Sequence, residues 1–352
     1  MIPANRLHAQ PVRWQQLWRE AITDPRELLR HLDLDAWADA LLANADTGFP
    51  LRVPRGFAAR MRRGDPRDPL LLQVLPQAAE LIEASGFVRD AVGDLAARSA
   101  HGVLHKYDGR ALLVATGSCA VHCRYCFRRH FPYADETAAA NRWQAAIGHL
   151  RADPTIGEAI LSGGDPLSLS TAKLEEFTDG LREIPHVRRL RLHTRLPVVL
   201  PERVDETLIR WLAGVPLQRV VVLHANHPRE IDDSVADACR RMREAGATLL
   251  NQAVLLRGVN DDADTLAELS ERLFGAGVLP YYLHQLDRVA GAAHFEVPES
   301  DGARIMQALR GRLPGYLVPQ WVREVTGAPS KQPLHDDDMT SRPWKSEPES
   351  GK

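Results

Sequence analysis

The sequence predicts an α/β protein built on a partial (β/α)6 TIM-like barrel, and two observations lead to this prediction. Apolar runs of strand length alternate with segments of helical periodicity through the central two thirds of the 352-residue chain. Parallel strands need crossover connections, and the segments between these runs are long enough to be helices. The six expected strands are ALLVAT (111–116), EAILS (158–162), RRLRLHT (188–194), RVVVLHA (219–225), TLLNQAVLL (248–256) and LPYYLHQL (279–286).

The chain divides into four parts around this barrel. Residues 1–100 carry the helical patterns WQQLWREAI, PRELLRHLD and LLQVLPQAAELIEASG, and we expect them to form a helical extension over the open side of the barrel. The barrel is expected at 101–313 and a C-terminal segment at 314–336. Residues 337–352 are polar and acidic, so they cannot bury enough apolar surface to fold, and we expect them to be disordered.

Charge and composition narrow the possible partners. The chain has 44 basic and 46 acidic residues, a formal net charge of -2, which gives no electrostatic reason to expect binding to nucleic acid or membranes. The N-terminal residues contain no long apolar run, so nothing there predicts export or anchoring. We therefore expect a cytoplasmic protein.

Three closely spaced cysteines are the strongest chemical signal. Cys119, Cys123 and Cys126 can ligate three irons of a cubic 4Fe-4S cluster and leave the fourth iron open. A cluster used only for electron transfer usually has four cysteine ligands. The one other cysteine, Cys239, lies in the helical pattern DDSVADACRRMREAGA and is expected to be a packing residue.

Two other interpretations of these cysteines remain open at this point. A structural zinc site normally has four protein ligands, so His122, His130 or a distant residue would have to complete it. A disulfide would require an oxidising compartment, for which the sequence gives no signal.

Polar residues recur where the expected strands end. In a barrel of this type the active site lies at the carboxyl ends of the strands, and each residue taken alone has a simpler interpretation as a buried hydrogen-bonding group. Their shared position predicts a site there. These residues are Cys119, the turn Gly163-Gly164-Asp165, Arg195, His224, Gln252 and Asp287.

The cysteine spacing C-x3-C-x2-C, with Tyr125 before the last cysteine, resembles the radical S-adenosylmethionine superfamily. This resemblance implies that S-adenosylmethionine binds the open iron through its amino and carboxylate groups. It also implies that a turn after the second strand meets the amino group of the cofactor. Here that turn is formed by Ser162, Gly163, Gly164 and Asp165.

A more specific resemblance, to the lysine 2,3-aminomutase family, extends from about residue 49 to residue 334. It implies that Lys331, in a Gly/Pro-rich loop where a lysine is ordinarily a solvated residue, holds pyridoxal phosphate as a Schiff base. The motifs that carry the resemblance are FPLRVPRGFAARMRRGDPRDPLLLQVLP (49–76), CRYCFRRHF, SGGDPL, RLPVVLP (195–201), HANHPREI, NQAVLLRGVND, PYYLHQLD and PGYLVPQWVREVTGAPSKQP (314–333).

The same resemblance implies roles for further residues. Tyr107 and Arg110 match positions at the pyridoxal phosphate, and a guanidinium suits a phosphate because its donors form a rigid fork. Arg128 matches the arginine that binds the carboxylate of the substrate. His224 and Gln252 match contacts of S-adenosylmethionine.

Asp287 and Glu324 match two acids that bind the distal ammonium of lysine. At the place of Glu324 the free-lysine enzymes carry an aspartate. The resemblance therefore does not fix the affinity for the substrate or the stereochemistry of the product. The chain also has no cysteine after Cys239, whereas long members of the family have a zinc-binding cysteine-rich tail. We therefore expect no zinc-built oligomer.

These features resemble the branch of the family that makes β-lysine for elongation factor P. The resemblance implies conversion of L-α-lysine to β-lysine, with the R enantiomer expected, and an external one-electron donor such as flavodoxin or ferredoxin. Three alternatives stay open: an aminomutase for another free amino acid, a radical S-adenosylmethionine enzyme without pyridoxal phosphate, and a non-catalytic iron-sulfur binding module.

Overall fold

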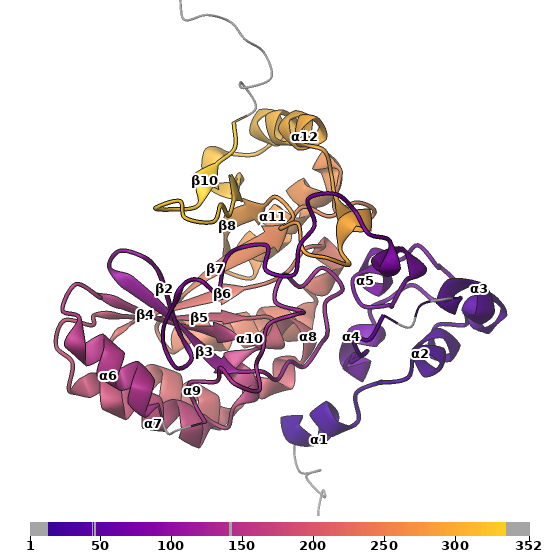
Figure 1. The fold of residues 1–352 in the computed structure, drawn as a ribbon. Helices are drawn as coiled ribbons and strands as arrows, with labels where there is room; N and C mark the ends of the chain where they lie inside the picture. Colours follow the sequence, from indigo (N-terminus) through magenta and orange to yellow (C-terminus); the bar gives the residue numbers. More distant parts are fainter. Residues whose placement is uncertain (1–12, 44, 46, 141–142, 336–352) are drawn as a thin grey trace, which may run out of the picture.

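A computed structural model describes residues 13–43, 45, 47–140 and 143–335 (Figure 1). The strands form one open sheet in sequence order, from β1 to β10. All six predicted strands are present, and each pairs in parallel with the next. They are β3 (Arg110–Thr116), β4 (Glu158–Gly163), β5 (Arg189–Thr194), β6 (Gln218–Leu223), β7 (Ala247–Val254) and β8 (Leu279–His284).

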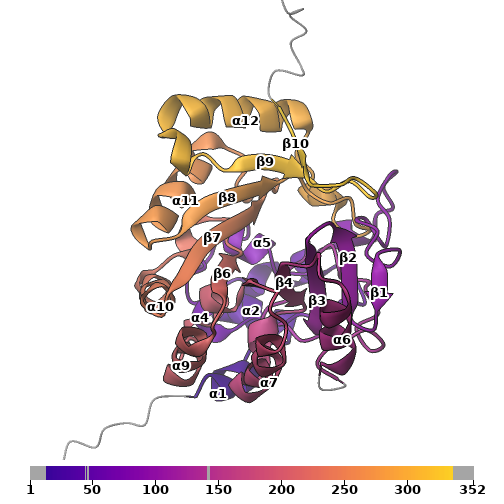
Figure 2. The ribbon, with the colours of Figure 1, turned by 90° about the vertical axis from the view of Figure 1, so that its left-hand side faces the viewer.

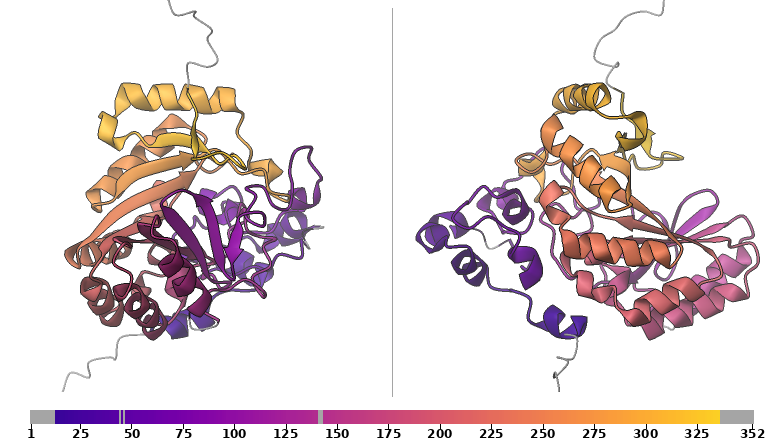
Figure 3. Two further views of the ribbon diagram at one scale, coloured as in Figure 1. Left: turned by 60° about the vertical axis from the view of Figure 1, so that its left-hand side comes forward. Right: turned by 180° about the vertical axis from the view of Figure 1, so that it is seen from behind.

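Helices cover the outer face of the curved sheet (Figures 2 and 3). Several begin at a side chain that accepts a hydrogen bond from the first turn: Ser170 caps α7, Asp205 caps α9 and Asp262 caps α11. Three helices of this layer, α6, α8 and α12, were not predicted. The layer comprises α6 (Gln144–Ala152), α7 (Thr171–Arg182), α8 (Leu196–Val199), α9 (Glu206–Gly214), α10 (Asp233–Glu244), α11 (Ala263–Gly275) and α12 (Glu299–Arg312).

Alternation along β5 shows how the barrel acquires a polar interior. Leu190 and Leu192 are buried in the main apolar core. Arg191 and His193, on the opposite face, line the central cavity. Successive side chains of a strand point to opposite faces, so the pattern RLRLHT supplies both the core and the wall of the cavity.

The sheet continues beyond the predicted barrel on both sides. A seventh parallel strand, β9 (Gln320–Arg323), pairs with β8 and was missed because its four residues are too short to show a period. The remaining strands pair antiparallel: β1 (Arg98–Ala100), β2 (Val103–Tyr107) and β10 (Gln332–Pro333). Glu324 directly follows β9, so it lies at the same strand ends as the predicted site.

The N-terminal extension lies to one side of the barrel, on the right of Figure 1. Its first two predicted helices are present as α1 (Trp14–Arg19) and α2 (Pro25–His31), followed by α3 (Ala38–Leu42) and α4 (Arg55–Ala58). The helix predicted over LLQVLPQAAELIEASG was wrong. Only α5 (Pro69–Leu72) and a 3-10 turn at Ala78–Leu81 form there, because Pro76 interrupts the backbone hydrogen bonding.

The proposed division into four parts stays a prediction, and the predicted disordered tail lies outside the described residues. Cys239 is buried in the core from α10, and burial raises its pKa to about 12. Across the described ranges, none of the helices has the length and apolarity needed to cross a membrane.

Candidate active site

A cavity of about 370 Å³ opens at the carboxyl ends of the parallel strands. Every residue that the sequence placed in the site lines this one cavity, although these residues come from many separate segments. The lining includes Tyr107, Arg110, Cys119, Cys123, Cys126, Arg128, Ser162, Gly163, Gly164, Asp165, His224, Gln252, Asp287, Glu324 and Lys331.

The cysteines lie in the loop that follows β3, and a buried ion pair fixes this loop to the N-terminal extension. Arg124 donates from Nε to Glu80 Oε1 at 2.8 Å, and neither side chain is exposed. Arg129 also binds Glu80, at 2.7 Å. Removing one partner of such a pair would leave an uncompensated buried charge, so the loop is held firmly.

All three cysteines are half-buried, free thiols that face the cavity. In the described part of the chain, no three His, Cys, Asp or Glu side chains are grouped to hold a single metal ion. A cubic cluster places each cysteine on a different iron, so its ligands need not converge on one point. The thiols and the space beside them therefore fit a 4Fe-4S cluster.

The glycine turn at the end of β4 packs against the start of the cysteine loop. Gly163 has φ of +110°, which a side chain would rarely allow. A Cβ on Gly164 would lie 2.5 Å from the carbonyl oxygen of Ser118, so only glycine permits this approach. The glycines thereby set the distance between the turn and Cys119.

Asp165 braces this turn against the segment after β5. Its carboxylate accepts from Thr194 Oγ1 at 2.7 Å and from the backbone N–H groups of Arg195 at 2.8 Å and Leu196 at 2.9 Å. Burial raises the pKa of Asp165, and these hydrogen bonds oppose the shift. The carboxylate of Asp165 thus has a structural role in addition to its position in the cavity wall.

Of the two residues predicted to contact S-adenosylmethionine by a single side chain, His224 directly follows β6 and Gln252 lies on the neighbouring strand β7. Gln252 has a buried Oε1 without a hydrogen-bond partner in the described structure. Burial lowers the pKa of His224 to about 3, so its ring is neutral. His193, which the sequence did not single out, lies with Nδ1 3.3 Å from His224 Nε2. The unpaired amide oxygen of Gln252 suits a polar ligand such as S-adenosylmethionine.

Lys331 lines the same cavity from the loop between β9 and β10. Its Nζ lies 2.8 Å from Glu324 Oε2, while Tyr107 donates its hydroxyl to Glu324 Oε1 at 2.7 Å. The guanidinium of Arg110 stacks on the Tyr107 ring at 4.6 Å and has no carboxylate partner among the described residues. A guanidinium without a carboxylate partner and a lysine amine in the same cavity fit the phosphate and aldehyde groups of pyridoxal phosphate.

Asp287 follows β8, is half-buried and lines the same cavity. Burial raises its pKa to about 7, although the charge of Lys331 opposes the shift. Asp287 is a half-buried acid to which the described side chains donate no hydrogen bond.

Asp94 and Lys106, which the sequence did not reveal, link Arg128 to the Lys331–Glu324 pair. Asp94 accepts from Arg128 Nε at 2.6 Å through one oxygen and pairs with Lys106 Nζ at 2.6 Å through the other. Lys106 also lies 3.5 Å from Glu324. Arg128 further donates to Ser162 Oγ at 3.0 Å. A chain of alternating charges thus runs from Arg128 to Lys331.

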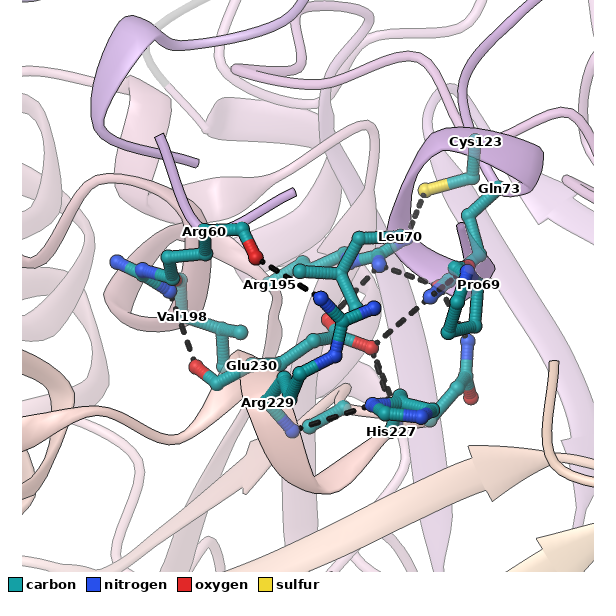
Figure 4. Close-up of polar contacts among 12 residues, drawn as sticks. Arg60, Pro69, Leu70, Gln73, Cys123, Arg195, Val198, His227, Arg229 and Glu230 are labelled. Carbon is teal, nitrogen blue, oxygen red and sulfur yellow. Dashed lines mark hydrogen bonds and ion pairs between the residues drawn. The ribbon is translucent and has the colours of Figure 1, made fainter. Parts of the chain in front are cut away.

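A second network surrounds Arg195, which the sequence placed among the polar strand-end residues. Figure 4 shows its side chain between Cys123, Gln73 and Glu230. The network joins the N-terminal extension, the cysteine loop and the segments after β5 and β6. Sequence spacing gave no sign of Gln73 or Glu230.

Comparison with known proteins places the chain in a family. The L-lysine 2,3-aminomutase of Escherichia coli (strain K12) is 49% identical over 323 residues, covering 91% of this chain and 94% of that protein. The chain belongs to the lysine 2,3-aminomutase family. Other members include the L-lysine 2,3-aminomutases of Haemophilus influenzae, 43% identical over 94% of this chain and 98% of that protein, and of Clostridium subterminale, 36% identical over 92% and 77%.

No family model matches the chain. Among solved structures, a radical SAM methyltransferase from Sphaerobacter thermophilus is similar at a TM-score of 0.46, with 21% identity, over 63% of this chain and 68% of that one. The α/β class and the partial barrel are visible in the strand order itself, so the predicted fold class is confirmed. Membership of the aminomutase family makes the chain an isomerase.

Proposed function

We propose that this protein is an L-lysine 2,3-aminomutase, which converts L-α-lysine to β-lysine, with R as the expected enantiomer. The observation that carries the proposal is the single cavity, which is lined both by the three cysteines and by the Lys331–Glu324 pair. The family relationship supports the same activity, because the relatives above are named L-lysine 2,3-aminomutase.

We assign a 4Fe-4S cluster to the three cysteines and S-adenosylmethionine to the adjacent wall. When bound, these groups supply a carbon radical that can take hydrogen from an unactivated C–H bond. The protein holds the two groups together and keeps water away from them. The proposed ligands are Cys119, Cys123 and Cys126 for the cluster, and residues 162–165, His224 and Gln252 for S-adenosylmethionine.

We assign pyridoxal phosphate to Lys331, with Tyr107 and Arg110 beside it. When bound, this group supplies a conjugated ring that delocalises an unpaired electron while the amino group moves between carbons. Lys331 is half-buried on the loop between β9 and β10, so its amine reaches the cavity from the edge of the sheet. Arg110 offers the phosphate its unpaired guanidinium.

The cavity also matches the charges of the substrate. Arg128 lies at the cysteine side and, while held by Asp94, can direct its remaining N–H groups to a carboxylate. Asp287 and Glu324 lie at the far side, where a distal ammonium would give Asp287 the partner that it lacks. Lysine carries a carboxylate at one end and an ammonium at the other, as this arrangement requires.

We extend the proposal to two partners. The cluster would receive one electron from an external donor such as flavodoxin or ferredoxin. The product would serve the modification of elongation factor P, a proposal that rests on the sequence resemblance of the loop Pro329-Ser330-Lys331. Mass spectrometry of elongation factor P from cells with and without this protein tests the second partner.

The main experiment offers the anaerobically reconstituted protein lysine, glutamate or arginine and resolves the products on a chiral column. We expect β-lysine from lysine, and only when S-adenosylmethionine, pyridoxal phosphate and a reductant are all present. Omitting each in turn serves as the control. If none of the three amino acids yields a β-amino acid, the proposed activity is wrong.

A further inference from the structure

Arg195 places a guanidinium against one of the three cysteines. It follows β5 directly, its residue is 5% exposed, and its Nη1 lies 2.8 Å from Cys123 Sγ and 2.6 Å from Tyr125 OH. Its Nη2 donates to Gln73 Oε1 at 2.6 Å and to Glu230 Oε2 at 2.9 Å (Figure 4). The cation is therefore shared between a thiol and a carboxylate.

Surrounding groups prevent this guanidinium from turning away. Asn226 donates from Nδ2 to Gln73 Oε1 at 3.0 Å and to Tyr125 OH at 2.6 Å, and its own N–H donates to Glu230 Oε1 at 2.9 Å. Gln73 and Glu230 are fully buried. Gln73, Tyr125 and Glu230, three of the four residues that Arg195 contacts, are thus each held by Asn226 as well, which fixes the guanidinium beside Cys123.

The backbone of Arg195 is fixed as well. Its N–H donates to Asp165 Oδ2 at 2.8 Å, and its guanidinium lies 5.6 Å from the centroid of the Phe57 ring. The aromatic face excludes water from one side of the cation. A charge in such a site interacts strongly with its neighbours because little solvent screens it.

We propose that Arg195 sets the reduction potential of the cluster by donating a hydrogen bond to the sulfur of Cys123, with Glu230 offsetting part of its charge. The inference rests on the cluster assignment made above. Hydrogen bonds to cluster sulfurs and local net charge are established determinants of the potential. Reduction adds one negative charge to the cluster, so a nearby donor stabilises the reduced state more than the oxidised state and raises the potential.

A purely structural role for Arg195 makes a different prediction. If the residue only braces the extension against the barrel, removing Arg195 or Glu230 should loosen the same contact and alter the cluster in the same way. If it acts electrostatically, the two changes should shift the potential in opposite directions. Arg195→Gln removes positive charge at Cys123, whereas Glu230→Gln leaves the positive charge of Arg195 uncompensated.

The test measures the potential directly, without turnover. Wild type, Arg195→Gln and Glu230→Gln are reconstituted anaerobically, assayed for iron and sulfide, and titrated with dithionite without S-adenosylmethionine while the paramagnetic reduced cluster is followed. Dithionite supplies the electron that takes the cluster from its 2+ to its 1+ state. The matched control is Arg203→Gln, since Arg203 is equally buried but donates to the carbonyl oxygens of Leu167 and Leu169.

We expect Arg195→Gln to lower the equilibrium constant for reduction at least tenfold, which is a negative shift of about 59 mV for one electron. Glu230→Gln should shift the potential upward, and Arg203→Gln should leave it unchanged. Unchanged potential in Arg195→Gln with full iron content, or shifts of the same sign in the first two variants, would overturn the inference.

The remaining outcomes are also informative. If Arg195→Gln fails to assemble a cluster, the sign of the Glu230→Gln shift decides alone, and a zero or negative shift refutes the inference. If wild type itself binds no iron, the cluster assignment has failed, which the iron and sulfide counts reveal before any potential is measured.

Discussion

Glu324 Oε2 lies 2.8 Å from Lys331 Nζ, so the amine proposed to hold pyridoxal phosphate is one half of an ion pair. Burial alone would raise the pKa of Glu324, but the charges and hydrogen bonds of Lys331, Tyr107 and Lys106 outweigh it and lower the pKa. Attaching the amine to a cofactor would remove the nearest cation. Glu324 Oε2 would then be open to the ammonium of a substrate, while Oε1 keeps the hydroxyl of Tyr107 and the more distant Lys106.

Changing Lys331 to Ala should separate the two halves of the proposed chemistry. The variant should keep its cluster and still cleave S-adenosylmethionine slowly, but should hold no cofactor adduct that borohydride can reduce and should form no β-amino acid. Absorbance near the visible edge and product analysis measure this. Lys173→Ala, at an exposed lysine paired with Glu176, is the control. Full activity of Lys331→Ala would remove this lysine from the mechanism.

Alanine at Cys119, Cys123 or Cys126 should abolish cluster assembly, because each thiolate is expected to ligate a different iron. Cys239→Ala should keep the full cluster, since Cys239 lies buried in the packing of α10. Iron and sulfide counts after reconstitution distinguish the two groups. Loss of iron in the Cys239 variant would refute the assignment.

Asp287→Asn should weaken the binding of lysine far more than the binding of an analogue that lacks the ε-amine. Removing one partner of a buried charge pair costs ~3–5 kcal/mol, or roughly a hundredfold to a few thousandfold in affinity. Comparison of KM and kcat for both substrates measures the difference. An equal loss of kcat/KM for the two substrates would show that Asp287 does not bind the ammonium. Another amino acid would then become the favoured substrate.

The raised pKa of Asp287, about 7, predicts a pH dependence of lysine binding. Below this pKa the carboxyl is protonated and attracts the ammonium weakly, whereas above it the carboxylate forms. The distal ammonium of lysine stays charged throughout, since its ordinary pKa is about 10.4. Lysine affinity should therefore rise as the pH increases through 7. Calorimetric titrations at several pH values, without S-adenosylmethionine, should show the dependence in wild type and its absence in Asp287→Asn.

Asp94 balances the charge of Lys106, so Asp94→Asn should disturb both ends of the substrate site. Arg128 loses its carboxylate partner, and Lys106 is left with Glu324, where it competes with the substrate ammonium. We expect a higher KM for lysine with a smaller change in kcat. The double variant Asp94→Asn/Lys106→Met should recover part of the loss. If adding Lys106→Met deepens the defect instead, Asp94 acts only on folding.

Much of the fold could be predicted from sequence because the positions of the polar residues agree with the periodicity of the strands. Strands such as RLRLHT alternate between core and cavity, and the polar residues at their ends fall on one edge of the sheet. The resemblance to a family supplied the roles of Lys331 and Arg110, which composition alone would have assigned to an exposed loop and a strand end. The structure adds that these residues share one cavity with the cysteines.

Contacts between distant segments and very short elements could not be predicted from the sequence, and the reasons are physical. Asp94 and Lys106 meet Arg128 through a fold in which β2 lies beside β3, and no spacing in the sequence records that pairing. Strand β9 is too short for its period to be recognised. The helix expected over residues 71–86 does not form because Pro76 has no backbone N–H to continue the helical hydrogen bonding.

The sheet order has a consequence for how the protein is made. The strands lie side by side in sequence order, from β1 to β10. Each strand therefore leaves the ribosome after the neighbour with which it pairs has been synthesised. The cysteine loop follows β3, whereas Lys331 adjoins β10. During translation the loop that carries the three cysteines can therefore pack before Lys331 has been synthesised, so the proposed cluster site can form before the proposed pyridoxal phosphate site.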